Sequence, residues 1–362
     1  MAGIKIKSDT PLFLAAGLLV CSSVVMVYAA SATSGGVLTK QLMWVALGLP
    51  TLVLTMRFDY RHYDQPFLIN SGVAVALVGL AAVLCMPAIG GSKRWFSLGQ
   101  VSIQPSEFAK LVLVIFTAST LTRHISHINE IRRSLLPVVI VLGLMSLLIF
   151  KEPDFGTCAA LCAIAGAMVF AAGLAYRHLA GAALAGIPLL TAAMLLEPYR
   201  VKRLLAFLDP WKDPTGAGFQ PIQSMIAVAT GGLTGRGLGM SDQRLGYLPA
   251  PSTDFIYAVI SEEMGLIGAT VILACFCVIA WRGLRIANRA PDPFGSLLAL
   301  GVTVMIALQA FANMSIVVNL LPNKGVTLPF VSSGGSSLLT CLIGLGILLN
   351  VSQHAQRGSA AT

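Results

Sequence analysis

Apolar segments long enough to cross a lipid bilayer recur along this chain from end to end. A spanning helix needs roughly 20 apolar residues at a rise of about 1.5 Å each. The candidate segments are Pro11–Ala30, Thr39–Met56, Phe67–Pro87, Pro105–Thr122, Ser134–Phe150, Thr157–Ala175, Leu179–Leu196, Phe255–Trp281, Ser296–Leu320 and Ser332–Val351. The pattern therefore predicts an all-α polytopic integral membrane protein of about ten transmembrane helices.

The composition and the connections support a single membrane domain over residues 1–362. Hydrophobic residues make up 56% of the chain and charged residues only 11%. The polar break at Tyr176-Arg177-His178 is very short, so a re-entrant hairpin is an alternative to two full spans there. One long polar connection, about Glu197–Asp254, separates the seventh and eighth predicted helices.

The distribution of basic residues predicts the orientation. With the N-terminus inside, twelve of the 24 Lys and Arg residues fall in inner connections and five in the short outer connections. Cytoplasmic connections carry the excess of Lys and Arg, so both termini are predicted to be cytoplasmic and the long connection extracytoplasmic. The first segment follows Lys5 and Lys7 but lacks a convincing small-x-small cleavage site, so we predict a retained helix.

Net charge and cysteines argue against two other classes of protein. The net charge of +9 is spread over several inner connections, as expected of topology determinants and not of a nucleic-acid site. All seven cysteines lie within predicted spans, and no further His or Cys completes a metal set beside Cys158 and Cys162. We interpret the cysteines as packing residues.

Four polar clusters flank the outer ends of the predicted helices. They are Gly90–Lys110, Lys151–Thr157, the long connection that ends at Asp254, and Asn319–Ser337. Ionisable groups at one membrane interface favour an amphipathic substrate, with its polar head in water and its tail in lipid.

In the first cluster, Pro105 is typical of a helix opening. Glu107 then lies in the first turn, and Lys110 follows at i+3, so the two side chains are predicted to pair on one face. Two roles remain open for Lys110: a structural ion pair within the membrane, or contact with an anionic headgroup.

Asp154 lies in a tight outer turn between Pro153 and Gly156. A helix cap, a turn and a catalytic role are all compatible with this position, and Lys151 is the neighbour that we expect to neutralise it. The basic run from Tyr199 to Arg203 suits either a substrate phosphate or diphosphate or the phosphates of surrounding lipid.

Asp254 directly precedes a long apolar span that contains Glu262 and Glu263. Helix capping would explain Asp254 alone, but carboxylates in the membrane are costly and usually functional. An apolar border raises the pKa of an Asp toward the range of a general base, whereas basic neighbours lower it. The glycine run at Gly231–Gly239 lacks the features of a nucleotide loop, so we expect close backbone packing there.

Further motifs follow one another along nearly the whole chain: Arg94-Trp95 with Leu98-Gly99, Gln104-Pro105-Ser106-Glu107 with Lys110, Pro153-Asp154-Phe155-Gly156-Thr157, Tyr199-Arg200 with Arg203, Asp209-Pro210-Trp211, Gln220 with Gln223-Ser224, Gly231-Gly232 with Gly235, Thr253-Asp254-Phe255 with Glu262-Glu263-Met264-Gly265, and the stretch from Leu321 to Ser337. Together they resemble the SEDS family (shape, elongation, division and sporulation), which includes FtsW, RodA and SpoVE. The segment Leu321–Phe330 resembles the division members more than the elongation members.

The resemblance implies a peptidoglycan glycosyltransferase that polymerises lipid II at the outer face of the cytoplasmic (inner) membrane, at the division septum. It implies a class B penicillin-binding protein and other divisome proteins as partners. It leaves open a divalent cation, Mg or Mn, and implies no organic cofactor. Ala250, Ser252 and Ser333 depart from the family's usual Glu, His and Tyr, so roles of those side chains do not carry over.

On this basis Asp254 is predicted to be the catalytic general base of an inverting transfer. The predicted substrate-binding residues are Arg94, Trp95, Glu107, Lys110, Asp154, Arg200, Arg203, Gln223, Glu262, Glu263, Lys324 and Ser336. Three alternatives remain: an elongation polymerase of the same family, a lipid II flippase whose path is lined by the membrane carboxylates and Lys110, and a scaffold that only activates the partner.

Overall fold

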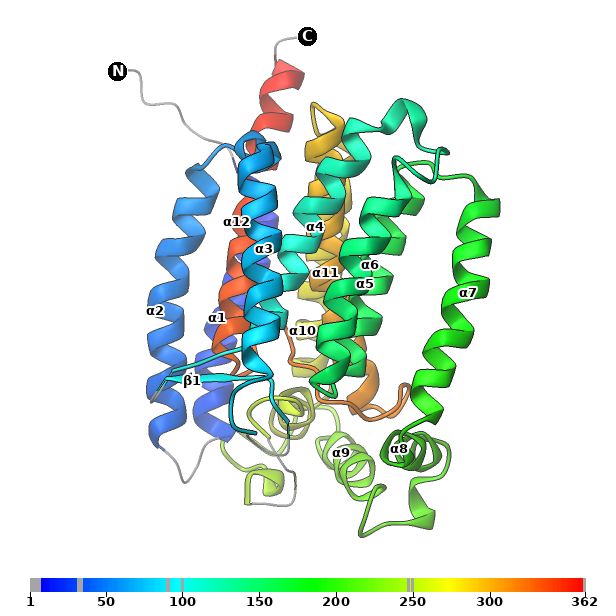
Figure 1. The fold of residues 1–362 in the computed structure, drawn as a ribbon. Coiled ribbons are helices and arrows are strands. Elements are labelled where there is room, and N and C mark those ends of the chain that lie inside the picture. The colour runs from blue at the N-terminus through cyan, green and yellow to red at the C-terminus, as the bar shows by residue number, and fades with distance from the viewer. Residues whose placement is uncertain are drawn as a thin grey trace.

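The computed structural model describes residues 8–30, 35–88, 92–98, 101–245, 248 and 251–360. This part of the chain forms an upright helical bundle with two surface helices and a small hairpin at one end (Figure 1). Its helices and strands are α1 (Thr10–Ala30), α2 (Gly35–Arg57), α3 (Pro66–Val83), β1 (Phe96–Leu98), β2 (Val101–Ile103), α4 (Pro105–Arg123), α5 (Leu135–Lys151), α6 (Phe155–Ala171), α7 (Tyr176–Leu195), α8 (Pro198–Leu208), α9 (Phe219–Thr230), α10 (Ile256–Arg289), α11 (Pro293–Val317) and α12 (Gly335–Ala360).

Each predicted span coincides with one long helix, and the remaining two helices, α8 and α9, lie in the long connection. Within the described residues, six helices are long and apolar enough to cross a membrane, namely α1, α2, α3, α10, α11 and α12. The shorter apolar helices α5 and α6 stand beside them in the bundle. The all-α polytopic fold is therefore confirmed, while the number of ten membrane crossings stays a prediction.

Helix α10 differs from its predicted span in two ways. It continues beyond Trp281 to Arg289, and it contains a non-helical residue, Gly265, with φ 64°. Beyond the predicted end, Arg282 donates from Nε to Oδ1 of Asp9 over 2.9 Å. This ion pair compensates the charge of Arg282, so a polar helical extension is stable where the hydropathy pattern ends.

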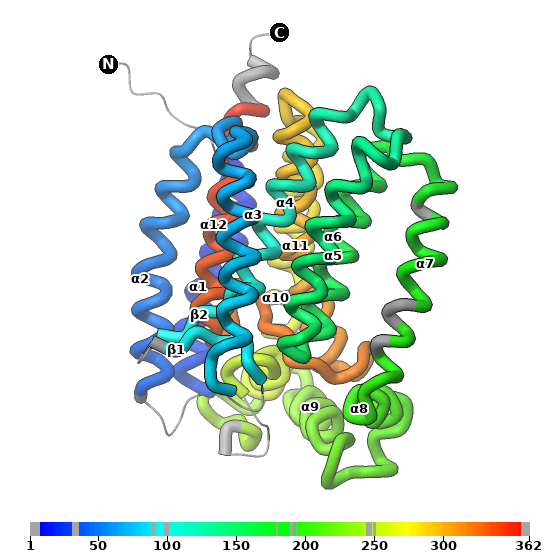
Figure 2. The backbone as a smooth tube through the Cα atoms, in the orientation of Figure 1, coloured from blue at the N-terminus to red at the C-terminus, as the bar shows by residue number. Residues whose placement is uncertain are grey.

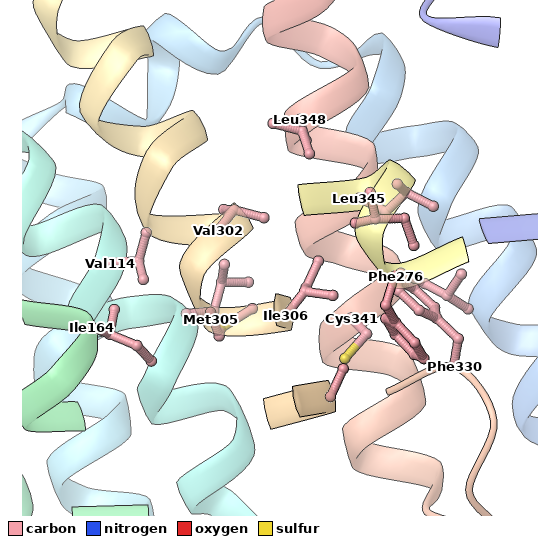
Figure 3. Packing of buried hydrophobic residues seen from close by; sticks show 14 of the residues in the cluster. Val114, Ile164, Phe276, Val302, Met305, Ile306, Phe330, Cys341, Leu345 and Leu348 are labelled. Carbon is pink, nitrogen blue, oxygen red and sulfur yellow. The ribbon is translucent and has the colours of Figure 1, made fainter. Parts of the chain in front are cut away.

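Helix α11 forms the centre of the bundle and is buried along most of its length. Figure 3 shows Val302, Met305 and Ile306 of α11 between Val114 on one side and Phe276 on the other. In lipid the hydrophobic effect does not drive helices together, so close van der Waals packing must hold the bundle. The small residue Gly301 permits this packing, because an added Cβ would lie 2.6 Å from Cγ1 of Val114.

The hairpin β1–β2 and the helices α8 and α9 lie at one end of the bundle (Figure 2). We call it the outer end, after the orientation that the sequence predicts. The hairpin is antiparallel and pairs Phe96 with Ile103. The C-terminal part of α12 lies at the opposite end. The long connection predicted over about 197–254 is thus largely structured, a feature that hydropathy alone does not reveal because α8 and α9 are short.

Candidate active site at the outer end of the bundle

The four polar clusters meet at the outer end, as the sequence predicts. Arg94 donates from Nε to the carbonyl of Glu152 over 2.8 Å and from Nη2 to that of Pro153 over 2.6 Å. The backbone N–H of Ser333 donates to the carbonyl of Ser252 over 2.9 Å. These bonds join segments that lie far apart in the sequence and fix the walls of one site.

Asp254 lies in the turn before α10, and its side chain does not cap that helix, whose N-cap is Phe255 without a side-chain cap bond. The capping explanation is therefore wrong in this structure. Burial raises the pKa of Asp254 from 3.8 to about 6, although Arg94 and Arg203 act to lower it. Desolvation of the carboxylate prevails over its two basic neighbours.

Asp154 combines a structural and an electrostatic role. Its Oδ1 accepts from the backbone N–H of Thr157 over 3.2 Å, which caps α6, and its Oδ2 accepts from the Thr157 hydroxyl over 2.8 Å. Nζ of Lys324 lies 3.2 Å from Oδ1 of Asp154. The expectation that Lys151 neutralises Asp154 is wrong: Lys151 ends α5 on the exposed side of the turn, whereas Lys324 reaches in from the loop before α12.

Burial acts to raise the pKa of Asp154, but Lys324 and Arg94, with the bonds from Thr157, hold it below its ordinary value. Burial lowers the pKa of Lys324, with Asp154 opposing that change. We call Arg94, Asp154, Arg203, Asp254 and Lys324 the Asp254 cluster. It contains three cations around two carboxylates, an arrangement suited to a polyanionic group.

Lys110 and Glu107 form the predicted pair, with Nζ 2.9 Å from Oε1, and both side chains are buried. Lys110 also donates to Oε1 of Gln309 on α11 over 2.6 Å. Gln309 in turn donates from Nε2 to the carbonyl of Thr327 over 3.1 Å. Lys110 is therefore connected to the loop before α12 through an amide.

The basic run lies on α8. The guanidinium of Arg200 stacks over the ring of Phe150 at 4.5 Å, and that of Arg203 over Tyr199 at 4.5 Å. Arg203 also donates from Nη1 to the carbonyl of Asn323 over 3.4 Å. These contacts hold Arg203 in place within the Asp254 cluster and Arg200 at its edge.

Glu262 and Glu263 lie apart from this cluster, beside the glycine run. Glu262 accepts from Arg236 Nη1 over 3.1 Å and from the hydroxyl of Ser241. The carbonyl of Glu263 accepts from the N–H of Gly237 over 3.0 Å. Gly235 has φ 81°, and an added Cβ would run into that same carbonyl. The predicted close backbone packing of the glycine run is confirmed.

Three other predicted residues lie within the polar clusters. Trp95 is half-buried just before β1. Gln223 accepts from Nε2 of Gln243 over 3.4 Å. Buried Ser336 accepts on Oγ from the backbone N–H of Gln104 over 3.2 Å. Ala250 lies outside the described residues. No substrate role follows from these contacts, and the roles assigned to the three residues stay predictions.

Sequence reasoning missed three residues that shape the site. Asn313 on α11 donates from Nδ2 to the carbonyls of Asp254, over 2.7 Å, and Val326, over 2.5 Å. Gly325 packs against the carboxylate of Asp254. Glu152 is buried, and burial raises its pKa to about 8, with Asp154 adding to the rise. A buried amide at the outer end of an apolar helix was the available signal for Asn313.

Within the described residues, no group of three His, Cys, Asp or Glu side chains is arranged to hold a metal ion. Two carboxylates lie in the Asp254 cluster, and one of them is already paired with Lys324. The described side chains of the Asp254 cluster therefore do not supply enough ligands to hold a divalent cation without help from a substrate.

Comparison with known proteins agrees with this architecture. A family model described as a cell cycle protein, covering FtsW, RodA and SpoVE, matches residues 9–357. The stage V sporulation protein E of Bacillus subtilis is 39% identical over 364 residues, covering 97% of this chain and 99% of that protein. A probable peptidoglycan glycosyltransferase FtsW of Geobacter metallireducens is 38% identical, covering 96% and 95%.

Solved structures extend the likeness to the fold. A chain from a peptidoglycan synthase complex, described as coordinating polymerization and crosslinking, superposes with a TM-score of 0.80 at 28% identity, covering 96% of this chain and 98% of that one. The rod shape determining protein RodA of Thermus thermophilus gives 0.71 at 26% identity, covering 96% and 97%. The fold and the outer site thus define a membrane-embedded SEDS-type protein. This chain belongs to the FtsW/RodA/SpoVE family, as its sequence motifs predicted.

Proposed function

We propose that this protein is a peptidoglycan glycosyltransferase that polymerises lipid II into glycan strands at the outer face of the cytoplasmic membrane during cell division. The observation that carries the proposal is Asp254, a carboxylate with a pKa raised to about 6, held among basic side chains at the end of the bundle that is predicted to face the outer aqueous phase. A base with a pKa near the working pH is efficient in proton transfer.

In the proposed reaction, Asp254 removes the proton from the 4-hydroxyl of the acceptor sugar. The resulting oxygen nucleophile attacks the anomeric carbon of the donor and forms the new glycosidic bond with inversion. The bond between that carbon and the diphosphate oxygen breaks, and undecaprenyl diphosphate leaves with the electron pair. The proton stays on Asp254 until it is released to water.

The negative charge that develops on the leaving diphosphate needs fixed positive charge close by. Arg94, Arg203 and Lys324 of the Asp254 cluster are assigned this role, with Arg200 at its edge. Lys110 is a further candidate, but its bonds to Glu107 and Gln309 already satisfy two of its three donors. No step is assigned to a divalent cation, because the described side chains do not form a protein-held site for one.

The proposed partner is a class B penicillin-binding protein, which would cross-link the strands, together with other divisome proteins. Support comes from the structural relative, which is part of a complex that coordinates polymerization and crosslinking. The proposed location is the division septum, with both termini in the cytoplasm. The basic residues of the inner connections support that orientation.

The test uses purified protein reconstituted in vesicles with lipid II labelled on its sugar. The proposal predicts labelled polymer with the wild type and none with Asp254→Asn. Transbilayer movement of the label without polymer would instead support the flippase. The burial and mutual pairing of Glu107 and Lys110 oppose that alternative, because a transport path needs such groups accessible to the headgroup.

A further inference from the structure

Asn313 on helix α11 contacts two loops of the site, the turn that holds Asp254 and the loop before α12. Its side chain is 1% exposed and lies on the outer part of α11. The amide nitrogen Nδ2 donates to the carbonyl of Asp254 over 2.7 Å and to that of Val326 over 2.5 Å. Because both neighbours are acceptors, the –NH₂ end of the amide must face them. Both protons of this –NH₂ group are therefore used to join two loops.

The second loop is the one that confines the Asp254 side chain. Gly325, adjacent to Val326, packs against Oδ2 of Asp254. Since Asn313 fixes the Val326 carbonyl relative to the Asp254 carbonyl, it also fixes how closely Gly325 covers the carboxylate. The bond from Ser332 Oγ to the carbonyl of Thr253, over 2.6 Å, secures the same two loops at a neighbouring point.

One helical turn earlier, Gln309 makes the equivalent link to the next residue of that loop. It donates to the carbonyl of Thr327 over 3.1 Å and accepts from Lys110 over 2.6 Å. The two amides of α11 hold consecutive residues, Val326 and Thr327, against the bundle. Helix α11 is buried and rigidly packed, so it is suited to carry a precise geometry.

We infer that Asn313 is a positioning residue for Asp254: by clamping the carbonyls of Asp254 and Val326 it keeps the Asp254 carboxylate covered and aligned for proton transfer. Asn313 itself touches neither substrate nor the reacting atoms in this inference. The inference rests on the proposed function, because it concerns the base of that reaction.

Loss of the clamp should change the electrostatics of Asp254 as well as its position. Burial is the main cause of the raised pKa of Asp254. Charged groups also face it from three other segments: Arg94 before β1, Arg203 on α8, and Asp154 at the start of α6, which is paired with Lys324. If the loops separate, water reaches the carboxylate, the effect of burial decreases, and the attraction of the two arginines remains. The pKa of Asp254 should then fall.

The experiment compares Asn313→Leu with a matched control, Asn350→Leu. Asn350 is also a buried amide with two backbone partners, since it donates to the carbonyl of Met56 over 2.9 Å and accepts from the N–H of Tyr60 over 2.9 Å. It lies on α12, remote from the Asp254 cluster. Both variants lose buried hydrogen bonds of the same kind, so a general loss of stability should affect both.

The rate of lipid II polymerisation is measured against pH for each variant. We expect Asn313→Leu to lower kcat by about 100-fold, the size expected when a catalytic group is displaced by about 1 Å. We also expect the acidic limb of its pH–rate profile, where the rate rises as the base loses its proton, to move from about pH 6 toward 3.8, the ordinary pKa of an Asp. Asn350→Leu should keep the limb of the wild type. If Asn313→Leu does not fold, the pH–rate profile of Asn313→Ser is measured in its place. This variant keeps one hydrogen-bond donor, and its acidic limb is compared with that of the wild type in the same way.

An acidic limb in the Asn313 variant that coincides with that of the wild type would overturn the positioning role. The proposed function fails in a different way, through polymerisation at the wild-type rate by Asp254→Asn. The two failures are therefore distinguishable.

Discussion

Gly325 packs directly against the carboxylate of Asp254, so that a Cβ added to Gly325 would lie 2.5 Å from Oδ2 of the acid. Real Cβ atoms do not approach other atoms so closely. The backbone of Gly325 is not in the left-handed region, so its φ and ψ are compatible with alanine. The obstacle to an alanine there is the collision of its Cβ with the carboxylate of Asp254. This contact offers a way to move the base without altering its chemistry.

Gly325→Ala should therefore push the side chain of Asp254 aside. We expect polymerisation to fall by about 100-fold while the protein remains folded, because misplacement by about 1 Å has that effect on a catalytic group. Gly186→Ala in α7 is the control, since a Cβ there meets nothing within 4 Å. A wild-type rate in Gly325→Ala would mean that the position of Asp254 is unimportant.

The raised pKa of Asp254 predicts the acidic limb of the activity profile. A general base acts only when deprotonated, so the rate should rise with pH and reach half of its plateau near pH 6. Initial rates measured from about pH 4 to about pH 8 test this expectation. A profile that is flat across this range would be incompatible with Asp254 as the base.

Glu152 predicts an unusual pH dependence of stability. Burial raises its pKa from 4.5 to about 8, so the folded state keeps a proton that the unfolded state releases. The contribution of Glu152 to the free energy of unfolding should therefore fall as pH rises from 4.5 to about 8. The raised pKa of Asp254 likewise makes its contribution to the free energy of unfolding fall, as pH rises from 3.8 to about 6.

Glu152→Gln removes the titration, so its thermal unfolding should vary less with pH. Near pH 8 we expect the variant to be more stable than the wild type, because the buried Glu152 carboxyl must by then either carry a desolvated charge or keep a proton that the unfolded state has released, and Gln does neither. Glu197→Gln, at an exposed position, serves as the control. Equal pH slopes for the wild type and Glu152→Gln would contradict the raised pKa.

The ion pair of Lys324 and Asp154 should be necessary for the stability of the fold, because Asp154 is buried and its charge needs a partner. Lys324→Met leaves that carboxylate without its partner, and we expect a loss of about 3 kcal/mol in the free energy of unfolding. Adding Asp154→Asn should restore much of this loss, since no unpaired charge remains and Asn still caps α6. Thermal unfolding in detergent measures both effects. A double variant no more stable than Lys324→Met would show that the pair is not the cause.

Gly235 should tolerate no side chain. Its φ is 81°, and a Cβ would meet the carbonyl of Glu263 at the kink of α10. Gly235→Ala therefore combines backbone strain with a collision, and we expect destabilisation by about 3 kcal/mol or more. Unfolding in detergent measures the loss, with Gly181→Ala as the control because its Cβ meets nothing within 4 Å.

The bundle could be predicted from the sequence because hydropathy depends on consecutive residues. The Glu107–Lys110 pair could be predicted for the same reason, since i and i+3 share a helix face. The partner of Asp154 could not, because Lys324 lies 170 positions later in the chain. Sequence proximity suggested Lys151, but the fold of the loop before α12 brings Lys324 to Asp154 instead.

The carboxylates of α10 illustrate a second limit. Glu262 and Glu263 share a segment with Asp254 in the sequence, yet Glu262 binds Arg236 of the glycine run and Ser241, which follows that run. The path of that run depends on positive φ at Gly235 and Gly237 and on tertiary contact with α10, which no local pattern encodes. Asn313 was missed because one amide in an apolar helix has no motif around it.

The most direct test of the catalytic role of Asp254 is the single-turnover rate of glycosidic bond formation by Asp254→Asn, which keeps the shape of the side chain and removes its basicity. Asp213→Asn, at an exposed position of the long connection, is the matched control. We predict a rate at least 100-fold below the wild type for Asp254→Asn, in the range expected for loss of a general base, and an unchanged rate for the control. Glycan synthesis by Asp254→Asn at the wild-type rate would contradict the account.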